Sequence, residues 1–328
     1  MSEFRVVISD YVFESFDAER EVLAGVGAEL EVLQCKSAQE LIPHLADAHA
    51  LLNTYLPGID KAVFDAAPQL KAVVRYGIGV DTIDVAEATR YGVMVANVPD
   101  YCIEEVSSHA LALFLCLNRK VAFSDAKVKA GEWSLSYVKP VTGIAEMTCG
   151  IIGFGRIGRE IARRLQGFGP TILFSDPVIA VAEVDGCRRV ELDDLFAQCD
   201  AIFVQCPANE KTRHLLGREA FAKMQRKPVI INAARGEIVD TEALVEALGA
   251  GLVSGAGLDV VEDEKALMEP DHPLRKLGNV VLTPHSAWYS TAAIRKLQRN
   301  AAEEVARVLR GETPRSLVNP EVLEANRP

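Results

Sequence analysis

Residues 149–158 are Cys-Gly-Ile-Ile-Gly-Phe-Gly-Arg-Ile-Gly, and residues 171–176 are Thr-Ile-Leu-Phe-Ser-Asp. The apolar start predicts a buried strand, and Gly153-x-Gly155-x-x-Gly158 predicts a sharp turn into a helix. The second apolar run predicts another strand, which ends in Asp176 about 20 residues after the glycines. Strand, glycines, helix, strand and acid in this order predict a dinucleotide-binding site.

Each glycine of this loop has its own expected task. Gly153 permits the tight turn, Gly155 lets the backbone approach a pyrophosphate, and Gly158 lets helix and strand pack closely. The amides of a helix that begins near Arg156 would face the phosphates, with the positive end of the helix dipole behind them. Asp176 would bond the ribose hydroxyls. The alternative, a glycine-rich turn beside a solvated strand-end aspartate, stays open at this point.

The rest of the chain alternates short apolar strands with helical segments, which predicts parallel sheets covered on both faces. Residues 1–98 contain no phosphate-binding glycine fingerprint, so this part should hold something other than the dinucleotide. Asn97-Val98-Pro99 is a plausible crossing point between domains. A continuous helical pattern then runs from Ile103 to Ala130, and the final helix, about Ala292 to Arg310, is expected to return to the first domain.

Length, charge and cysteine usage limit the classes of function. A chain of 328 residues should form two domains, and a net charge of -11 disfavours binding to nucleic acid or to an anionic membrane. The seven scattered cysteines include no Cys-x-x-Cys pair, which favours reduced core residues in a cytoplasmic protein. The N-terminus lacks a signal-peptide pattern, and the most apolar stretch, Ala110 to Leu117, is far short of the ~20 residues that span a bilayer.

Three strand ends carry polar residues that periodicity does not require. Arg235 follows the predicted strand Val229 to Ile231, Glu264 lies in the acidic run after Val253 to Gly257, and His285 follows Val280 to Leu282. Taken singly, the arginine could cap a helix, the glutamate could be solvated, and the histidine could be a packed core residue. Because open α/β sheets bind ligands at the carboxyl ends of their strands, the three together predict a site beside the dinucleotide.

At this point the sequence resembles the D-isomer-specific 2-hydroxyacid dehydrogenase family, and within it the C-terminal binding protein branch. The resemblance covers nearly the whole chain. It rests on the stretches Arg75-Tyr76-Gly77-Ile78-Gly79-Val80-Asp81-Thr82-Ile83-Asp84, Asn97-Val98-Pro99, the glycine loop, Asn232-Ala233-Ala234-Arg235-Gly236, Gly257-Leu258-Asp259-Val260 and Thr283-Pro284-His285-Ser286-Ala287-Trp288-Tyr289-Ser290. Trp288 and Arg75 point to the narrower branch.

The resemblance implies an α/β fold with two doubly wound parallel-sheet domains and a cleft between them. Residues 99–288 would be a Rossmann NAD-binding domain, and residues 1–98 with 289–328 a flavodoxin-like substrate-binding domain. The catalytic set would be Arg235, Glu264 and His285. Substrate contacts would come from Arg75, Tyr76, Gly77, Ile78, Gly79 and Trp288. Cofactor contacts would come from Val106, Gly153, Gly155, Arg156, Ile157, Gly158, Asp176, Cys206, Pro207, Thr212, Ala233, Ala234, Arg235, Asp259 and His285. A homodimer is also implied, with Trp133 and Tyr137 candidates for its contact.

The sequence departs from the family pattern in two places. Ser107-Ser108-His109 stands where the family usually has an acidic residue in the long helix. Lys265 stands where a proline usually follows the acidic loop, which leaves a choice of register between Glu262 and Glu264. Glu264 is preferred because the family's carboxylate lies five residues after the aspartate matched by Asp259.

The implied reaction is the reversible conversion of a 2-keto acid, NADH and a proton into a D-2-hydroxy acid and NAD⁺. His285 would protonate the forming alkoxide, and a nearby Glu264 would stabilise its imidazolium form. Arg235 would hold the substrate carboxylate and polarise the carbonyl, with the Gly77–Gly79 amides and Arg75 on the other side. Trp288 would line the pocket or pack between domains. Asp176 would repel a 2′-phosphate, which predicts NAD(H) over NADP(H).

Other classes of function receive less support from the sequence. The sequence contains neither the Gly-x-Ser-x-Gly motif of α/β-hydrolases nor the His-Glu-x-x-His motif of zinc proteases. Its six histidines do not have the spacing of metal ligands, so no metal is expected. The main alternative is an NAD(H)-sensing co-repressor scaffold of the C-terminal binding protein type, which would be a dimer with little catalysis. Oxidation of an inorganic or phosphonate-like anion is a third possibility, against which Trp288 argues mildly.

Overall fold

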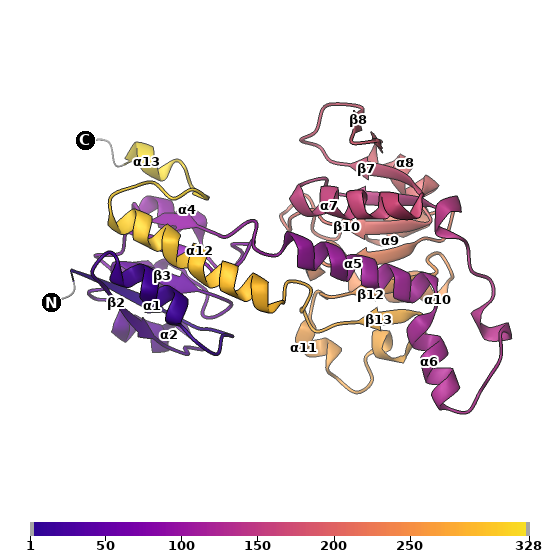
Figure 1. The fold of residues 1–328 in the computed structure, drawn as a ribbon, viewed down its shortest axis with the longest axis horizontal. Coiled ribbons are helices and arrows are strands. Elements are labelled where there is room, and N and C mark those ends of the chain that lie inside the picture. Colours follow the sequence, from indigo (N-terminus) through magenta and orange to yellow (C-terminus); the bar gives the residue numbers. More distant parts are fainter. Residues whose placement is uncertain (1–2, 326–328) are drawn as a thin grey trace. The chain divides into compact units, whose positions relative to one another are not determined.

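The computed structural model of the protein describes residues 3–325. The chain divides into two units, Met1–Cys102 with Ser290–Pro328, and Ile103–Tyr289 (Figure 1). Both boundaries lie slightly later in the chain than the predicted ones. Residues 1–2 and 326–328, which the sequence-based prediction assigned to the substrate domain, lie outside the described residues.

The first unit is built on a five-stranded parallel sheet of order β2-β1-β3-β4-β5, the flavodoxin-like order. One face of the sheet carries an apolar core that includes Val7, Leu51, Phe64 and Val73. The other face is covered by α12, which packs on α1 and β4. The elements are β1 (Phe4–Ile8), α1 (Asp17–Ala24), β2 (Ala28–Val32), α2 (Ala38–Leu41), β3 (Ala50–Asn53), α3 (Lys61–Asp65), β4 (Ala72–Arg75), α4 (Val85–Arg90), β5 (Met94–Ala96), α12 (Thr291–Leu309) and α13 (Val322–Ala325).

The second unit contains an eight-stranded sheet of order β13-β12-β11-β10-β6-β7-β9-β8, parallel except for the edge strand β8. The elements are α5 (Ile103–Asn118), α6 (Val121–Lys129), β6 (Thr148–Ile152), α7 (Arg156–Leu165), β7 (Thr171–Ser175), β8 (Glu183–Val184), β9 (Cys187–Arg189), α8 (Leu192–Gln198), β10 (Ala201–Val204), α9 (Arg218–Ala222), β11 (Val229–Asn232), α10 (Thr241–Gly249), β12 (Gly255–Leu258), α11 (Glu264–Leu267) and β13 (Val280–Leu282).

The strands of this second sheet are apolar on both faces because helices cover both. Phe203 belongs to the core shared with α5 and α7, whereas its neighbour Ile202 belongs to the core shared with α8, α9 and α10. Alternate residues of a strand point to opposite faces, so a strand between two helical layers needs apolar residues at every position. The predicted fold class, with two doubly wound parallel α/β sheets, is confirmed.

The prediction of one continuous helix from Ile103 to Ala130 is wrong, because the structure has two helices there. The helix α5 ends at Asn118, Lys120 adopts a left-handed backbone with φ 54°, and α6 begins at Val121. The physical reason is burial: α5 buries Val106, Ala110 and Phe114 among others, whereas no residue of α6 is buried among the described residues. The apolar stripe that holds α5 on the sheet therefore stops before α6.

Candidate active site

The three loop glycines meet different surroundings. A side chain at Gly153, whose φ is 88°, would approach the backbone nitrogen of Cys206 to 2.6 Å, and one at Gly158 would collide with the carbonyl of Gly153. A side chain at Gly155 would meet no described atom within 4 Å. Two glycines are therefore required by the protein's own packing, whereas the open space at the third fits the approach of a pyrophosphate.

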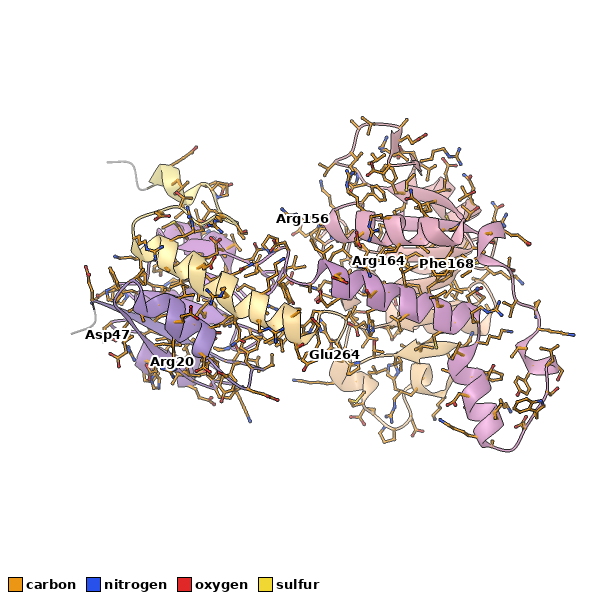
Figure 2. The ribbon with its side chains drawn as sticks, viewed as in Figure 1. Arg20, Asp47, Arg156, Arg164, Phe168 and Glu264 are labelled. Carbon is orange, nitrogen blue, oxygen red and sulfur yellow. The ribbon has the colours of Figure 1, made fainter. Side chains whose placement is uncertain are left out.

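The helix α7 presents its N-terminus at this open position. Gly155 is its N-cap and has no side chain that could accept hydrogen bonds from the first-turn amides. These amides and the positive end of the helix dipole are suited to bind a phosphate. Figure 2 shows Arg156 at the beginning of α7. The sequence thus places a cationic side chain at an end of a helix that already favours anions.

Asp176 ties the glycine loop to the end of β7. Its Oδ2 accepts a hydrogen bond of 2.7 Å from the Phe154 amide, and its Oδ1 accepts one of 2.9 Å from the Val178 amide. A carboxylate oxygen has a second lone pair, so both oxygens keep acceptor capacity for ribose hydroxyls. Asp176 therefore orders the loop and can also bind a sugar.

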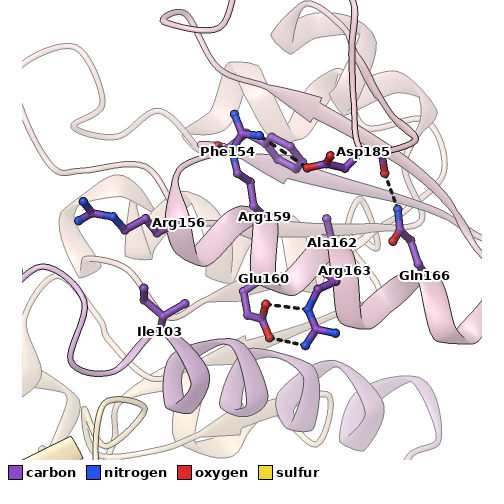
Figure 3. A pocket seen from close by; sticks show the side chains of 9 residues that line it. All are labelled: Ile103, Phe154, Arg156, Arg159, Glu160, Ala162, Arg163, Gln166 and Asp185. Atoms are coloured by element: carbon purple, nitrogen blue, oxygen red, sulfur yellow. Dashed lines mark hydrogen bonds and ion pairs between the residues drawn. The ribbon is translucent and has the colours of Figure 1, made fainter. Parts of the chain in front are cut away.

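A pocket beside the glycine loop is lined by Phe154 and charged residues of α7 (Figure 3). The Arg159 guanidinium lies over the Phe154 ring, 5.2 Å from its centroid. Hydrogen bonds from Arg163 lower the pKa of Glu160 to about 2, so this carboxylate stays ionised and offsets positive charge. In Figure 3 the Arg156 side chain points away from Glu160.

The three strands that precede Arg235, Glu264 and His285 are neighbours in the sheet. Ile231 of β11 pairs with Gly257 of β12, and Leu258 of β12 pairs with Leu282 of β13. The loops that follow therefore leave the same edge. A side chain at Gly236 would collide with the backbone of Val261, so the loop after β11 lies directly against the acidic loop after β12.

His285 lies beside Glu264, with 3.1 Å between Nδ1 and Oε1. Both side chains are partly exposed, and Glu264 begins α11 (Figure 2). Glu262 lies elsewhere in the network, because its Oε1 accepts hydrogen bonds from Arg213 Nη2 at 2.6 Å and pairs with His214 Nε2 at 2.7 Å. The structure therefore pairs Glu264, and not Glu262, with His285.

The backbone around His285 is held in an unusual conformation. His285 has a φ of 52°, and its amide donates to the Asp259 carbonyl at 2.9 Å. The Trp288 indole Nε1 donates to the His285 carbonyl at 2.9 Å. Left-handed backbone costs a residue other than glycine roughly 1 kcal/mol or more, so these bonds are needed to hold it. Within this loop Trp288 acts as a brace, and its two roles considered from the sequence, pocket wall and packing between domains, both stay predictions.

Asp259 organises the turn from inside the protein. Asp259 is 2% exposed, and its carboxylate accepts hydrogen bonds from the amides of Ser286 at 2.9 Å and Ala287 at 2.8 Å. A further donor, the Thr283 hydroxyl, lies at 2.6 Å from Oδ1. This role in holding the loop was not predicted, because the resemblance implied only a contact between Asp259 and the cofactor.

Arg235 is positioned by a residue that sequence reasoning missed. The buried Asn232 accepts a hydrogen bond of 3.0 Å from the Ala234 amide and donates one of 2.9 Å to the Arg235 carbonyl. Arg235 Nη1 donates to the Ala234 carbonyl at 2.8 Å. The signal was present in the sequence, since a strand-end asparagine commonly bonds the backbone two residues later.

The other predicted cofactor contacts follow two strands or lie on two helices. Cys206 and Pro207 follow β10, and Thr212 Oγ1 donates to the Pro207 carbonyl at 2.6 Å. Burial raises the pKa of the Cys206 thiol to about 11, so this group is neutral near pH 7. Ala233 and Ala234 follow β11, and Ile157 lies in the first turn of α7. Val106 is buried on α5, so the protein itself covers most of its surface.

In the first unit, the Arg75–Gly79 segment is folded on itself. The Arg75 guanidinium donates to the Tyr76 carbonyl, packs against Gly77 and lies 5.1 Å from the centroid of the Tyr55 ring. Tyr76 is one of the predicted substrate contacts, but its side chain is buried. Tyr76 is 1% exposed, and its hydroxyl donates to the buried Glu19 at 2.8 Å. The physical reason is that the aromatic ring turns into the apolar core, where Glu19 satisfies its hydroxyl.

Three further properties concern metal ions, membranes and cysteines. Within residues 3–325, no three histidine, cysteine or acidic side chains gather in a way that could hold a metal ion. No helix in that range combines the length and the apolar character that a bilayer crossing requires. All seven cysteines are free thiols, and six of them are buried.

Comparison with known proteins identifies the family of the chain. The model of the D-isomer specific 2-hydroxyacid dehydrogenase NAD-binding domain matches residues 111–287. The chain is 37% identical to the glyoxylate reductase of Korarchaeum cryptofilum over 89% of both proteins. It is 39% identical to the glyoxylate reductase of Thermococcus onnurineus, again over 89% of both.

A solved structure extends the likeness to the whole fold. The D-lactate dehydrogenase of Aquifex aeolicus, complexed with NAD and lactic acid, is 26% identical and superimposes with a TM-score of 0.84 over 98% of both chains. These relatives are glyoxylate reductases and a lactate dehydrogenase, so they add no support to the narrower resemblance to C-terminal binding proteins. The chain belongs to the D-isomer specific 2-hydroxyacid dehydrogenase family, and it is an NAD-dependent oxidoreductase that interconverts 2-keto acids and D-2-hydroxy acids.

Proposed function

We propose that this protein reduces glyoxylate, or a 2-keto acid of similar size, with His285 as the general acid. The observation that carries the proposal is the 3.1 Å contact between His285 Nδ1 and Glu264 Oε1. With Nδ1 engaged by a carboxylate, Nε2 is the ring nitrogen that gives its proton to the forming alkoxide. The names of the relatives from Korarchaeum cryptofilum and Thermococcus onnurineus support glyoxylate as the first candidate.

Each residue of the set has a defined task in the reaction. NADH, when bound, supplies the hydride to the keto carbon. The Arg235 guanidinium is a cation, so it binds the substrate carboxylate and stabilises the negative charge that develops on the carbonyl oxygen. Glu264 orients the His285 ring and stabilises its imidazolium form before the proton leaves. In the oxidative direction His285 takes the proton back.

The cofactor site is proposed at the N-terminus of α7. The open space at Gly155 and the amides that follow it would hold the pyrophosphate, and Asp176 would accept from the ribose hydroxyls. Arg156, Ile157, Cys206, Pro207 and Thr212 are proposed as further cofactor contacts. Arg75 to Gly79 are proposed as substrate contacts through their backbone amides, since the Tyr76 side chain is buried.

A panel assay tests the substrate. NADH oxidation is followed with glyoxylate, pyruvate, hydroxypyruvate, 4-methyl-2-oxopentanoate and phenylpyruvate at equal concentrations. The proposal expects the highest kcat/KM with glyoxylate or hydroxypyruvate. A preference for the branched or aromatic acid would contradict the substrate size. Tight NADH binding without turnover of any acid would instead favour the scaffold role that the resemblance to C-terminal binding proteins suggests.

We also propose a homodimer in which α6 and the segment after it contact a second copy. Trp133 is 90% exposed and Leu135 is 66% exposed, and Val121 and Val128 of α6 also lie on the surface. Apolar side chains grouped on one segment indicate a protein interface. Sedimentation velocity should give a dimer for the native chain and a monomer for the Trp133→Ser, Leu135→Ser double variant. A monomer for the native chain would overturn the proposal.

A cytoplasmic location is proposed as well, on the evidence of seven cysteines that form no disulfide. Cell fractionation with an antibody against the native protein tests it. Recovery in a secreted or membrane fraction would contradict it.

A further inference from the structure

A histidine outside the proposed catalytic set is connected to the loop that carries His285. His109 lies on α5, and its Nε2 is 2.8 Å from the Thr283 hydroxyl and 3.4 Å from Asp259 Oδ1. Thr283 is 174 residues away from His109 in the sequence, so only the fold brings the two together. The sequence marked this position only as a departure from the family's helix pattern.

The hydrogens of this contact can be assigned from the chemistry of its partners. An ionised carboxylate only accepts hydrogen bonds, so the Thr283 hydroxyl gives its one hydrogen to Asp259 at 2.6 Å. Thr283 must therefore accept from His109, which fixes the His109 proton on Nε2. The bonds run in one direction, from His109 through Thr283 to Asp259.

Asp259 is the point where this chain of bonds reaches the His285 loop. Besides Thr283, its carboxylate holds the amides of Ser286 and Ala287, and its carbonyl holds the amide of His285. A buried carboxylate is costly unless its lone pairs are satisfied, and removal of one donor makes its geometry less determined. The backbone of His285, with φ 52°, depends on that geometry.

We propose that His109 is a positioning residue for His285, acting through Thr283 and Asp259. The inference rests on the proposed function in one respect, that His285 is the general acid. His109 fixes the rotamer of the Thr283 hydroxyl, Thr283 fixes Asp259, and Asp259 sets the turn that aims the imidazole at Glu264. A small displacement of an acid from its proton acceptor lowers the rate of the chemical step more than the affinity for the cofactor.

A double-mutant cycle tests the direction of action. His109→Leu removes the donor, and Thr283→Val removes the hydroxyl while it keeps the shape. Each single variant should lower kcat about fivefold to twentyfold, with the Kd of NADH unchanged within about twofold. In the Thr283→Val background, His109→Leu should lower kcat by less than about twofold more, because the connection is already broken. His109→Gln, which keeps an N–H donor, should recover part of the loss.

Ser108→Ala, an exposed neighbour on the same helix, is the matched control and should keep kcat within about twofold of the native value. The proposal would be overturned if the double variant lost kcat by the full product of the two single-variant losses, because His109 and Thr283 would then act independently. It would also be overturned by a His109→Leu variant that unfolds at a lower temperature but turns over at the native rate, since that result describes a purely structural residue.

A second readout does not depend on turnover. In ¹⁵N-histidine spectra, His109→Leu should shift the ring signals of His285 and leave those of His214, which pairs with Glu262, unchanged. If the native protein reduces no 2-keto acid but this shift appears, the proposed function fails and the positioning proposal stands. An unchanged His285 signal would overturn the positioning proposal whatever the enzyme does.

Discussion

Glu264 Oε1 lies 3.1 Å from His285 Nδ1, although 21 residues separate the two in the sequence. The contact arises because β12 and β13 are adjacent parallel strands, so the segments that follow them leave the same edge of the sheet. Glu262, two residues earlier, pairs with Arg213 and His214 instead. One acidic loop thus contains two carboxylates with separate tasks, and a matched pair of variants can distinguish them.

Glu264→Gln should lower kcat for glyoxylate on the order of 10²-fold, because the His285 imidazolium loses its counter-charge and the fixed orientation of its ring. Glu262→Gln removes one negative charge from the same loop at nearly the same place and should change kcat by less than about fivefold. Steady-state kinetics of both purified variants check this. Equal losses for the two would show that the effect is loop charge rather than the contact with His285.

Gly155 and Gly158 should respond differently to alanine. Gly155→Ala fills space that no described atom occupies, so unfolding should be unchanged while the Kd of NADH rises at least about tenfold. Gly158→Ala meets the Gly153 carbonyl, so it should destabilise the fold by about 1–3 kcal/mol. Thermal unfolding and NADH fluorescence titration measure the two effects. Native NADH affinity in Gly155→Ala would argue against pyrophosphate binding at this position.

Asp176 should decide between NADH and NADPH. A 2′-phosphate beside this carboxylate brings like charges together, so the native protein should bind NADH at least about tenfold more tightly than NADPH. Asp176→Ser should reduce this ratio, although it also loses bonds to the Phe154 and Val178 amides and so should weaken both cofactors somewhat. Asp185→Asn, which removes an exposed carboxylate lining the adjacent pocket, should leave the ratio unchanged. A native preference for NADPH would contradict the account.

Glu19 should make stability depend on pH. Burial raises the pKa of this carboxyl, which accepts hydrogen bonds from Tyr76 and Gln298. A pKa raised in the folded state means that folding favours the protonated form. Its stabilising contribution is therefore complete below the unfolded-state pKa and is lost as pH rises through the folded-state pKa.

Glu19→Gln should consequently gain stability relative to the native protein between about pH 5 and about pH 8, as measured by urea unfolding at both values. Glu21→Gln, an exposed carboxylate on the same helix paired with Arg299, should show no such trend. A Glu19→Gln variant that loses stability toward high pH relative to the native chain would reverse the sign of the argument.

Much of the fold could be predicted because its signals are local. The predicted strand Val280 to Leu282 has the bounds of β13, and the predicted strand Val229 to Ile231 ends one residue before β11 does, since each is a short apolar run bounded by turn residues. The break at Lys120 could not be predicted, because the helical pattern continues through it and only the loss of packing ends α5. The segment 177–200, with β8, β9 and α8, received no prediction, and its short elements carry little periodicity.

The contact between Glu264 and His285 could be predicted, but not how the residues of the site are held. Strand-end position indicated Arg235, Glu264 and His285, because the carboxyl ends of parallel strands converge. The inward orientation of Tyr76, the support of Arg235 by Asn232, and the contact of His109 with Thr283 depend on side-chain geometry between distant segments. A sequence pattern shows only the spacing of residues along the chain. Those three features have no characteristic spacing, so no pattern indicates them.

The most direct test of the account is the His285→Asn variant, assayed with glyoxylate beside the native enzyme. Asparagine tolerates the left-handed backbone at this position, so the loop keeps its conformation while the acid is removed. We predict that kcat falls by about 10²–10⁴-fold while the Kd of NADH stays within about threefold of the native value. A variant that still turns over within about tenfold of the native rate would contradict the assignment of His285 as the general acid.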